Sequence, residues 1–218
     1  MKLSVLDQST SAKGATQDLA IRESIALAQH CDRLGYHRYW VSEHHASDSI
    51  VGSAPEVLMA AIAATTKQIR VGSAGVMLPH YSALKVAEQF RILEAIAPGR
   101  IDLGVGRAPG SDRLTSMALN PYSNAADEFP QQVLDLQAWV CGLPLQEGHP
   151  FAAIKAHPQG PSSPQLWILG TSDYGAQVAL RLRELAARLE LDELVINTWT
   201  FDPAARHRSY ELLAREFF

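Results

Sequence analysis

Residues 82–107 read SALKVAEQFRILEAIAPGRIDLGVGR, and this stretch combines one helix pattern with one strand pattern. Ser82–Ala97 predicts a helix, and Pro98-Gly99 ends it, because proline cannot continue a helix and glycine favours helix ends. The short apolar run Ile101–Val105 then predicts a buried strand. A helix that leads directly into a buried strand is the repeating unit of parallel α/β folds.

The same alternation extends through the rest of the chain. The predicted strands begin near Leu3, Tyr39, Ile69, Ile101, Leu166 and Leu194, and the one at Ile69 runs to Leu78. The other predicted helices are Ile21–Leu34, Glu56–Thr65, Ala126–Val140, Ser172–Leu180, Leu182–Leu189 and Pro203–Phe217. This pattern predicts an α/β fold with a parallel sheet covered on both faces, in a single domain over residues 1–218. Periodicity alone leaves an open doubly wound sheet and a closed barrel as alternatives.

The composition excludes several classes of partner. The chain has 218 residues, 47% of them hydrophobic, and 19 Lys+Arg against 23 Asp+Glu, for a net charge of -4. Without a broad positive surface, neither nucleic acid nor an anionic membrane is an expected partner. Cys31 and Cys141 have no CxxC spacing, so neither a disulfide scaffold nor structural zinc is expected. The sequence shows neither a signal-peptide pattern nor a long apolar run, which predicts a cytoplasmic protein.

Polar residues gather just after the predicted strands. They are Asp7-Gln8, Glu43-His44-His45, Arg107, Thr171-Ser172 and Asn197. The carboxyl ends of parallel strands meet at one edge of a sheet or one mouth of a barrel, which is where both folds place their sites. We therefore expect the functional site at this edge.

The segment Gly104-Val105-Gly106-Arg107-Ala108-Pro109-Gly110 comes close to the dinucleotide fingerprint GxGxxG. Its third glycine is one residue late, and Pro109 prevents a helix from continuing, which argues against a Rossmann NAD site. Gly104 and Gly106 instead allow the backbone to approach a flat ligand, and Arg107 offers a guanidinium group to a phosphate or carboxylate. A glycine-rich turn with a solvated arginine is the alternative.

Glu43-His44-His45 raises the question of a metal site. Adjacent residues on a strand point to opposite faces, and the sequence supplies no second histidine cluster, so no metal is expected. A histidine at the carboxyl end of a strand suits an acid, a base or a hydrogen-bond donor, because its ordinary pKa is about 6.5. We therefore take His44 as the candidate catalytic residue, with a structural histidine as the alternative.

Gly72-Ser73-Ala74-Gly75 places four small residues in a predicted strand, where packing normally favours branched side chains. Such a run allows a large ring to approach the backbone closely. A β-bulge is the alternative explanation.

Four segments together carry a family resemblance. They are Tyr39–His45 (YWVSEHH), Ile69–Pro79 (IRVGSAGVMLP), Ala87–Phe90 (AEQF) and Pro98–Gly110 (PGRIDLGVGRAPG). They are similar to the bacterial luciferase-like flavin monooxygenase family, and within it to the non-luminescent alkanal-monooxygenase-like branch. The resemblance implies a TIM (β/α)8 barrel that uses FMN as FMNH2 supplied by a separate reductase. Oxygen (O2) would be captured at flavin C4a as a hydroperoxide, which oxygenates an aldehyde or similar small apolar substrate.

The resemblance also implies roles for particular residues. His44 matches the histidine that acts beside flavin C4a, and Arg107 matches the arginine that binds the FMN phosphate. Ala74-Gly75 stands where the family often has a non-prolyl cis peptide against the isoalloxazine, so both residues are cofactor-binding candidates. Gly106 replaces the reactive cysteine of the luciferases, so no thiol chemistry carries over to it. Thr171-Ser172 resembles the second half of the phosphate site, at a predicted helix N-terminus that suits an anion.

The chain departs from the family in length. A complete barrel takes about 250 residues, and the family has two further strands and an insertion between segments that resemble 175–180 and 181–185, which are adjacent here. Either the protein lacks these strands, or the sequence joins pieces of a longer protein. We favour the second reading, because an incomplete parallel barrel exposes unpaired edges. The expected fold is thus an incomplete TIM-type barrel.

Two further functions stay open at this point: a non-catalytic flavin-binding protein with a truncated barrel, and an F420-dependent oxidoreductase of the same superfamily. A homodimer is also expected, because Glu56–Thr65 is apolar on every side and packing on the sheet covers only part of it. In this dimer the helices 56–65 and 82–97 pair across a two-fold axis. Ala60, Ala61, Ala63 and Ala64 are small enough to let a second helix approach closely, and the helix 82–97 adds Val86, Phe90 and Leu93 to the contact. The alternative is that the C-terminal helix or the segment 142–164 of the same chain covers this face.

Overall fold

The computed structural model describes residues 4–11, 14–107, 112–121, 126–170 and 195–196. The chain divides into two compact units, residues 1–166 and 167–218. The predicted helices over 172–180, 182–189 and 203–217, and the candidate residues Thr171 and Ser172, lie outside the described residues.

The first unit is built on a parallel sheet. Its strands are β1 (Ser4–Asp7), β2 (Arg38–Val41), β3 (Arg70–Ser73) and β5 (Ile101–Gly106), which are neighbours in this order, and β4 (Val76–Met77), which pairs with β5. Every one of these pairings is parallel, and Val41 of β2 lies opposite Ser73 of β3. The parallel α/β class predicted from the sequence is confirmed.

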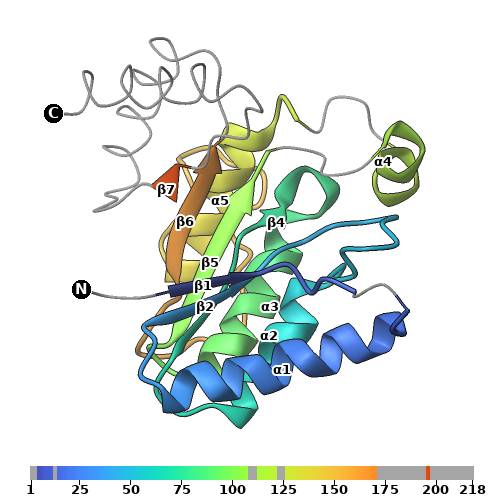
Figure 1. Ribbon diagram of the computed structural model, residues 1–218. Coiled ribbons are helices and arrows are strands. Elements are labelled where there is room, and N and C mark those ends of the chain that lie inside the picture. Colours follow the sequence, from blue (N-terminus) through green and yellow to red (C-terminus); the bar gives the residue numbers. More distant parts are fainter. Residues whose placement is uncertain (1–3, 12–13, 108–111, 122–125, 171–194, 197–218) are drawn as a thin grey trace, which may run out of the picture. The chain divides into compact units, whose positions relative to one another are not determined.

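The helices follow the predicted alternation closely. They are α1 (Gln17–Arg33), α2 (Pro55–Thr65), α3 (Ala83–Ile96), α4 (Arg113–Leu119) and α5 (Phe129–Cys141). In Figure 1, α1, α2 and α3 lie side by side along the sheet. Among the described residues, none of the helices has both the length and the apolar character that a bilayer crossing requires.

Local signals explain where the helices begin and end. The Ser82 hydroxyl accepts a hydrogen bond from Lys85 N at 3.5 Å and so caps the start of α3. Gly142 ends α5 with a φ of 68°, a left-handed conformation that glycine adopts without a steric penalty. The sequence analysis missed α4, although Asp112 marks its start by accepting hydrogen bonds from the backbone of Leu114 and Thr115.

The predicted continuous strand from Ile69 to Leu78 is wrong. β3 ends at Ser73, the peptide bond between Ala74 and Gly75 is cis, and β4 covers only Val76–Met77 before a short 3₁₀ helix, η1 (Leu78–His80). β4 does not continue the pairing of β3 and instead pairs beside the end of β5, where Val76 lies opposite Val105.

The outer surface of α2 and α3 differs from the prediction. Val86, Phe90 and Leu93 are only 1%, 0% and 2% exposed, because they pack inside the unit, so they are not available to a dimer contact. The exposed apolar side chains of these helices are Val57 at 66%, Ile92 at 50% and Ile96 at 45%.

A buried aspartate organises the amino ends of the strands. Asp102 accepts hydrogen bonds from Arg38 Nη1 at 2.5 Å, from Trp40 Nε1 at 2.9 Å and from Arg70 Nη2 at 2.6 Å and Nε at 2.9 Å. Its side chain is fully buried. Four donors satisfy the carboxylate where water cannot reach it, and they tie β2, β3 and β5 together at the end opposite the expected site.

A buried arginine anchors the segment between α5 and β6. Arg91 of α3 is 4% exposed. Its guanidinium donates to the carbonyl oxygens of Pro158 at 2.7 Å and Ser162 at 2.8 Å, and to that of Val140 at 3.2 Å. Arg91 therefore ties α3 both to the end of α5 and to two backbone positions of the proline- and glycine-rich excursion predicted over 142–164.

The second unit is described only in part. Its strand β7 (Val195–Ile196) pairs in parallel with β6 (Gln165–Gly170), and Leu169 lies opposite Val195. The strand predicted near Leu166 is confirmed, and the one predicted near Leu194 is confirmed over two residues.

Candidate functional site

The carboxyl ends of the strands in the first unit bring most of the candidate residues to one edge. His44 follows β2, Ala74-Gly75 lies between β3 and β4, and Gly106-Arg107 ends β5. Because these strands are parallel neighbours, their carboxyl ends share one edge of the sheet. The predicted placement of the described candidates at this edge is therefore confirmed.

Backbone hydrogen bonds fix the loop that carries His44. His44 N donates to Gly52 O at 2.9 Å, Val51 N donates to Ser9 O at 3.1 Å, and Ser11 N donates to Ser49 O at 2.8 Å. The loop after β2 is thus paired with the loop after β1, through segments about 40 residues apart in the chain. The backbone of His44 is therefore fixed within its own loop, and that loop is fixed against the loop after β1.

His44 is half-buried and paired with a serine. Its Nδ1 lies 3.2 Å from Ser42 Oγ, and its Nε2 makes no hydrogen bond to any other described residue. Burial lowers the pKa of His44, and the charge of the adjacent Glu43 opposes this shift without cancelling it. A neutral imidazole with one ring nitrogen unengaged can accept or donate a proton at neutral pH.

Glu43 and His45 form a separate cluster on the opposite face of the chain. The fully buried Glu43 carboxylate accepts hydrogen bonds from Met77 N at 2.9 Å, Tyr81 Oη at 2.6 Å and His45 Nε2 at 2.7 Å. Burial, reinforced by the hydrogen bond to Glu43, raises the pKa of Tyr81, so this phenol stays protonated. We call these residues, Glu43, His45, Met77 and Tyr81, the Glu43 cluster.

The sequence analysis anticipated only part of this arrangement. The alternation along a strand predicts that Glu43 and His45 share a face and that His44 points away from them, and the structure confirms it. Tyr81 and Met77 were missed, because no local pattern pairs residues more than thirty positions apart. Within the described ranges, no group of three or more His, Cys, Asp or Glu side chains converges as metal ligands would.

The Ala74–Gly75 segment is tied to both neighbouring strands. Its peptide bond is cis, as the family resemblance leads one to expect. Ala74 N donates to Val41 O at 2.8 Å, and the buried Ser73 hydroxyl donates to Gly104 O at 2.8 Å while accepting from Gly104 N at 3.0 Å. The backbone at this edge is thereby held in register between β2 and β5.

Gly106 and Arg107 leave room for a ligand. A Cβ built on Gly106 would have no atom within 4 Å, so the packing of the protein does not itself require a glycine there. Arg107 is exposed and makes no hydrogen bond or ion pair with another described residue. A guanidinium group with unused donors beside open space suits a phosphate or carboxylate.

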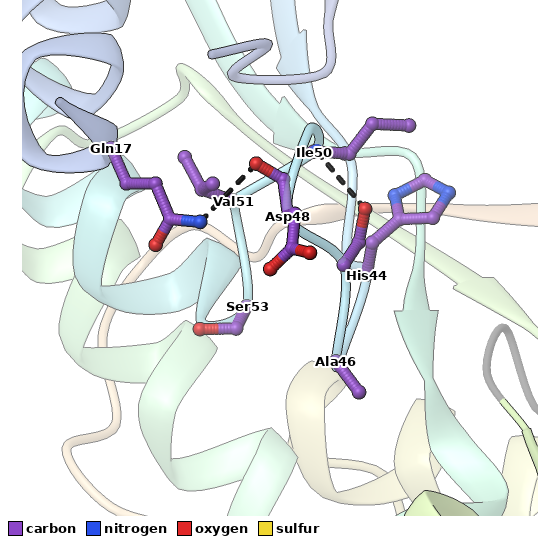
Figure 2. Close-up of a pocket in the computed structure, with 8 residues that line it drawn as sticks. Gln17, His44, Ala46, Asp48, Ile50, Val51 and Ser53 are labelled. Carbon is purple, nitrogen blue, oxygen red and sulfur yellow. Dashed lines mark hydrogen bonds between the residues drawn. The ribbon is translucent and has the colours of Figure 1, made fainter. Parts of the chain in front are cut away.

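An open pocket of about 350 Å³ lies beside His44. Figure 2 shows its lining, which consists of Gln17, His44, Ala46, Ser47, Asp48, Ile50, Val51 and Ser53. Gln17 Nε2 donates to Asp48 O at 3.2 Å and links the start of α1 to the loop after β2. Of the described candidate residues, His44 alone lines this pocket, so the imidazole borders it while Ala74-Gly75 and Gly106-Arg107 lie elsewhere along the edge.

Comparison with curated proteins relates the chain to monooxygenases. It is 45% identical over 183 residues to the N-acetyl-S-alkylcysteine monooxygenase of Bacillus subtilis (strain 168), a match that covers 84% of this chain and 54% of that protein. It is 41% identical over 180 residues to a luciferase-like monooxygenase of Escherichia coli (strain K12), covering 82% and 52%. The chain thus spans about half the length of these relatives.

Solved structures, among them a monooxygenase and a dehydrogenase, have a similar fold. Apo-MsnO8 superposes with a TM-score of 0.79 at 39% identity, covering 100% of this chain and 60% of that one. The oxygenating constituent of 3,6-diketocamphane monooxygenase from the CAM plasmid of Pseudomonas putida, in complex with FMN, has a TM-score of 0.72 at 21% identity, covering 99% and 62%. An F420-dependent secondary alcohol dehydrogenase has a TM-score of 0.68 at 15% identity, covering 99% and 64%. The last two likenesses concern the fold alone.

A family model establishes the relationship over most of the chain. The model for luciferase-like monooxygenases matches residues 1–186, which include every strand of the first unit and the candidate residues of its carboxyl edge. The incomplete parallel barrel agrees with this fold. The chain belongs to the luciferase-like monooxygenase family.

Proposed function

We propose that this chain carries the flavin site of an FMN-dependent monooxygenase. The observation that supports the proposal most strongly is the grouping of His44, Ala74-Gly75 and Arg107 at the carboxyl ends of adjacent strands. This edge combines an imidazole whose pKa is lowered by burial, backbone with small residues, and an exposed arginine that makes no hydrogen bond or ion pair with the rest of the described chain.

The described residues fit FMN in chemical character. Arg107 would bind the phosphate, since its donors are unused, and Gly106 leaves open space where a side chain would otherwise project. The Ala74–Gly75 segment would lie against the isoalloxazine ring. When bound in its reduced form, FMN would supply the electrons that activate O2 at its C4a carbon.

His44 would act as the acid or base beside the flavin. Its Nδ1 is engaged by Ser42 and its Nε2 is not, so Nε2 is the atom that would hold or move the proton. Because burial lowers the pKa of His44, the imidazole is neutral and ready to accept a proton at neutral pH. Reduced flavin would come from a separate reductase through a transient encounter.

Two substrate classes are candidates. The branch of the family that the sequence resembles favours a medium-chain aldehyde or similar small apolar molecule. The relative named N-acetyl-S-alkylcysteine monooxygenase, at 45% identity, favours a thioether of this N-acetyl-S-alkylcysteine type instead. Both require a site that excludes water around an apolar chain.

FMN titration of the purified chain tests the cofactor. Arg107→Ala should weaken FMN binding by about 2 to 5 kcal/mol if the guanidinium is desolvated against the phosphate. Arg33→Ala is the matched control, because Arg33 is an exposed arginine at the end of α1, near the amino end of β2. Equal FMN affinity in the wild type and in Arg107→Ala would favour the alternative, in which Arg107 is a solvated arginine of a glycine-rich turn. Tight binding of F420 with no binding of FMN would favour the F420-dependent alternative.

Oxygen consumption with reduced FMN tests the reaction. The wild type should consume O2 and oxygenate either the aldehyde or the thioether, whereas His44→Ala should bind FMN normally and turn over about 10² to 10⁴ times more slowly. FMN binding without turnover on both substrates would favour the non-catalytic flavin-binding alternative.

A further inference from the structure

The Glu43 cluster connects two of the chain segments that are assigned to the site. Glu43 precedes His44 in the chain, and its carboxylate reaches Met77 of β4 and Tyr81 just beyond η1. Met77 follows the Ala74–Gly75 segment by two residues. One buried side chain therefore joins the segment that carries His44 to the segment that carries the cis peptide.

The cluster uses both oxygens of the carboxylate. Met77 N donates to Oε2 at 2.9 Å, whereas Tyr81 Oη at 2.6 Å and His45 Nε2 at 2.7 Å both donate to Oε1. An ionised carboxylate accepts on both oxygens, but an amide of the same shape accepts on one and donates on the other. A glutamine therefore cannot accept from all three groups. In one orientation its NH2 faces Met77 N, which can only donate and is left unpaired. In the other orientation Tyr81 Oη and His45 Nε2 must accept hydrogen bonds instead of donating them, so the pattern of the cluster changes.

We propose that Glu43 is a positioning residue, which sets the placement of His44 relative to the Ala74–Gly75 segment through its hydrogen bonds to Met77 and Tyr81. The inference rests on the proposed function, because these two segments are the ones assigned to FMN and to proton transfer. The Glu43 side chain is fully buried and does not line the pocket beside His44. It acts through its neighbours.

The chain offers a matched control in a second buried glutamate. Glu94 of α3 is 3% exposed and accepts a hydrogen bond from Gly99 N at 2.7 Å, just before the amino end of β5. Glu94→Gln also perturbs a buried carboxylate, but at the far end of the strands. If the role of Glu43 is purely structural, Glu43→Gln and Glu94→Gln should change FMN affinity and turnover equally for an equal loss of stability.

The test measures FMN affinity, turnover and unfolding for both variants of the purified chain, together with Tyr81→Phe. We expect Glu43→Gln to weaken FMN binding or to slow turnover at saturating FMN by about 10- to 100-fold, because small displacements of reacting groups have effects of this size. Tyr81→Phe should have a smaller effect in the same direction, and Glu94→Gln should change neither quantity. Unchanged affinity and turnover in Glu43→Gln, or equal losses in Glu94→Gln, would overturn the inference.

A second measurement does not depend on flavin. In the protein without FMN, Glu43→Gln should speed amide hydrogen exchange at Met77 and move the ring resonances of His44, while Glu94→Gln leaves both unchanged. If the wild type binds no FMN, the proposed function fails while this measurement still decides whether Glu43 links the two segments. Unaltered His44 resonances and Met77 exchange in Glu43→Gln would refute the link.

Discussion

The indole ring of Trp40 occupies the space that a side chain on Gly72 would need. A Cβ built on Gly72 would lie 2.6 Å from both Trp40 Cδ1 and Trp40 Nε1, and 2.7 Å from Asp102 Cβ. Trp40 and Asp102 lie opposite Gly72 on the neighbouring strands. Gly72 thus makes room for the ring of Trp40, which belongs to the protein itself. This corrects the expectation that a ligand ring approaches the backbone at the Gly72 end of the small-residue run.

This contact predicts contrasting effects at two glycines. Gly72→Ala should lower the free energy of unfolding by about 1 to 3 kcal/mol, because overpacking shifts Trp40 and Asp102. Gly106→Ala should stay within about 0.5 kcal/mol of the wild type, since nothing lies within 4 Å of its Cβ. Denaturant unfolding of both variants measures this. Similar stability losses at the two positions would contradict the packing argument.

A second prediction concerns Arg91. Arg91→Leu should lower the free energy of unfolding by about 3 kcal/mol or more, because several buried carbonyl oxygens lose their donor. Limited proteolysis should also cut residues 157–163 faster in this variant. The control is Arg22→Leu, which removes an exposed ion pair with Asp18 and should cost less than about 1 kcal/mol. Resistance of the segment to proteolysis in Arg91→Leu would argue that other contacts hold it.

A third prediction concerns pH. Because burial holds the pKa of His44 below its ordinary value of 6.5, the unfolded chain binds this proton more readily than the folded protein does. The neutral imidazole therefore contributes stability above pH 6.5, and this contribution is lost as the pH falls through the folded pKa. NMR titration should place the midpoint of His44 below 6.5, and His44→Gln should lessen the loss of stability on acidification. A midpoint above 6.5 would show that the Glu43 charge outweighs burial.

A fourth prediction concerns assembly, which we propose is a homodimer through α2 and α3. The exposed apolar side chains available for it are Val57, Ile92 and Ile96. Ala61 of α2 is smaller and partly exposed. Ala61→Glu would place an unpaired charge in this contact and should convert a dimer to a monomer at micromolar concentration. Leu114→Glu on α4, where Leu114 is 78% exposed, should leave the oligomeric state unchanged. Sedimentation of the wild type as a monomer would exclude the dimer.

Much of the architecture could be predicted because its signals are local. The helix caps at Ser82 and Gly142 and the buried run at Ile101 lie within a few residues of the elements they define. The polar residues after the strands likewise predict the functional edge, since strand direction alone brings His44 and Arg107 to it.

The break at Ala74–Gly75 was not predicted from the local pattern, because the small residues Gly72–Gly75 are flanked by apolar residues that favour a strand on both sides, and this pattern does not say whether the strand continues or ends. The identity of the exposed residues on α3 was also missed. Both faces of α3 carry apolar side chains, so only packing against α2 and α5 determines that Phe90 is buried and Ile92 is exposed.

The sequence by itself determined the parallel α/β class, the alternation of most helices and strands, the family and the edge that carries the candidate site, because each depends on short segments of neighbouring residues or on strand direction. Only the tertiary structure decided that Glu43 joins Met77 and Tyr81, that Arg91 holds the segment before β6, and that Trp40 requires a glycine at position 72. These contacts join residues more than thirty positions apart. Their partners are chosen by packing, and no short-range pattern encodes that choice.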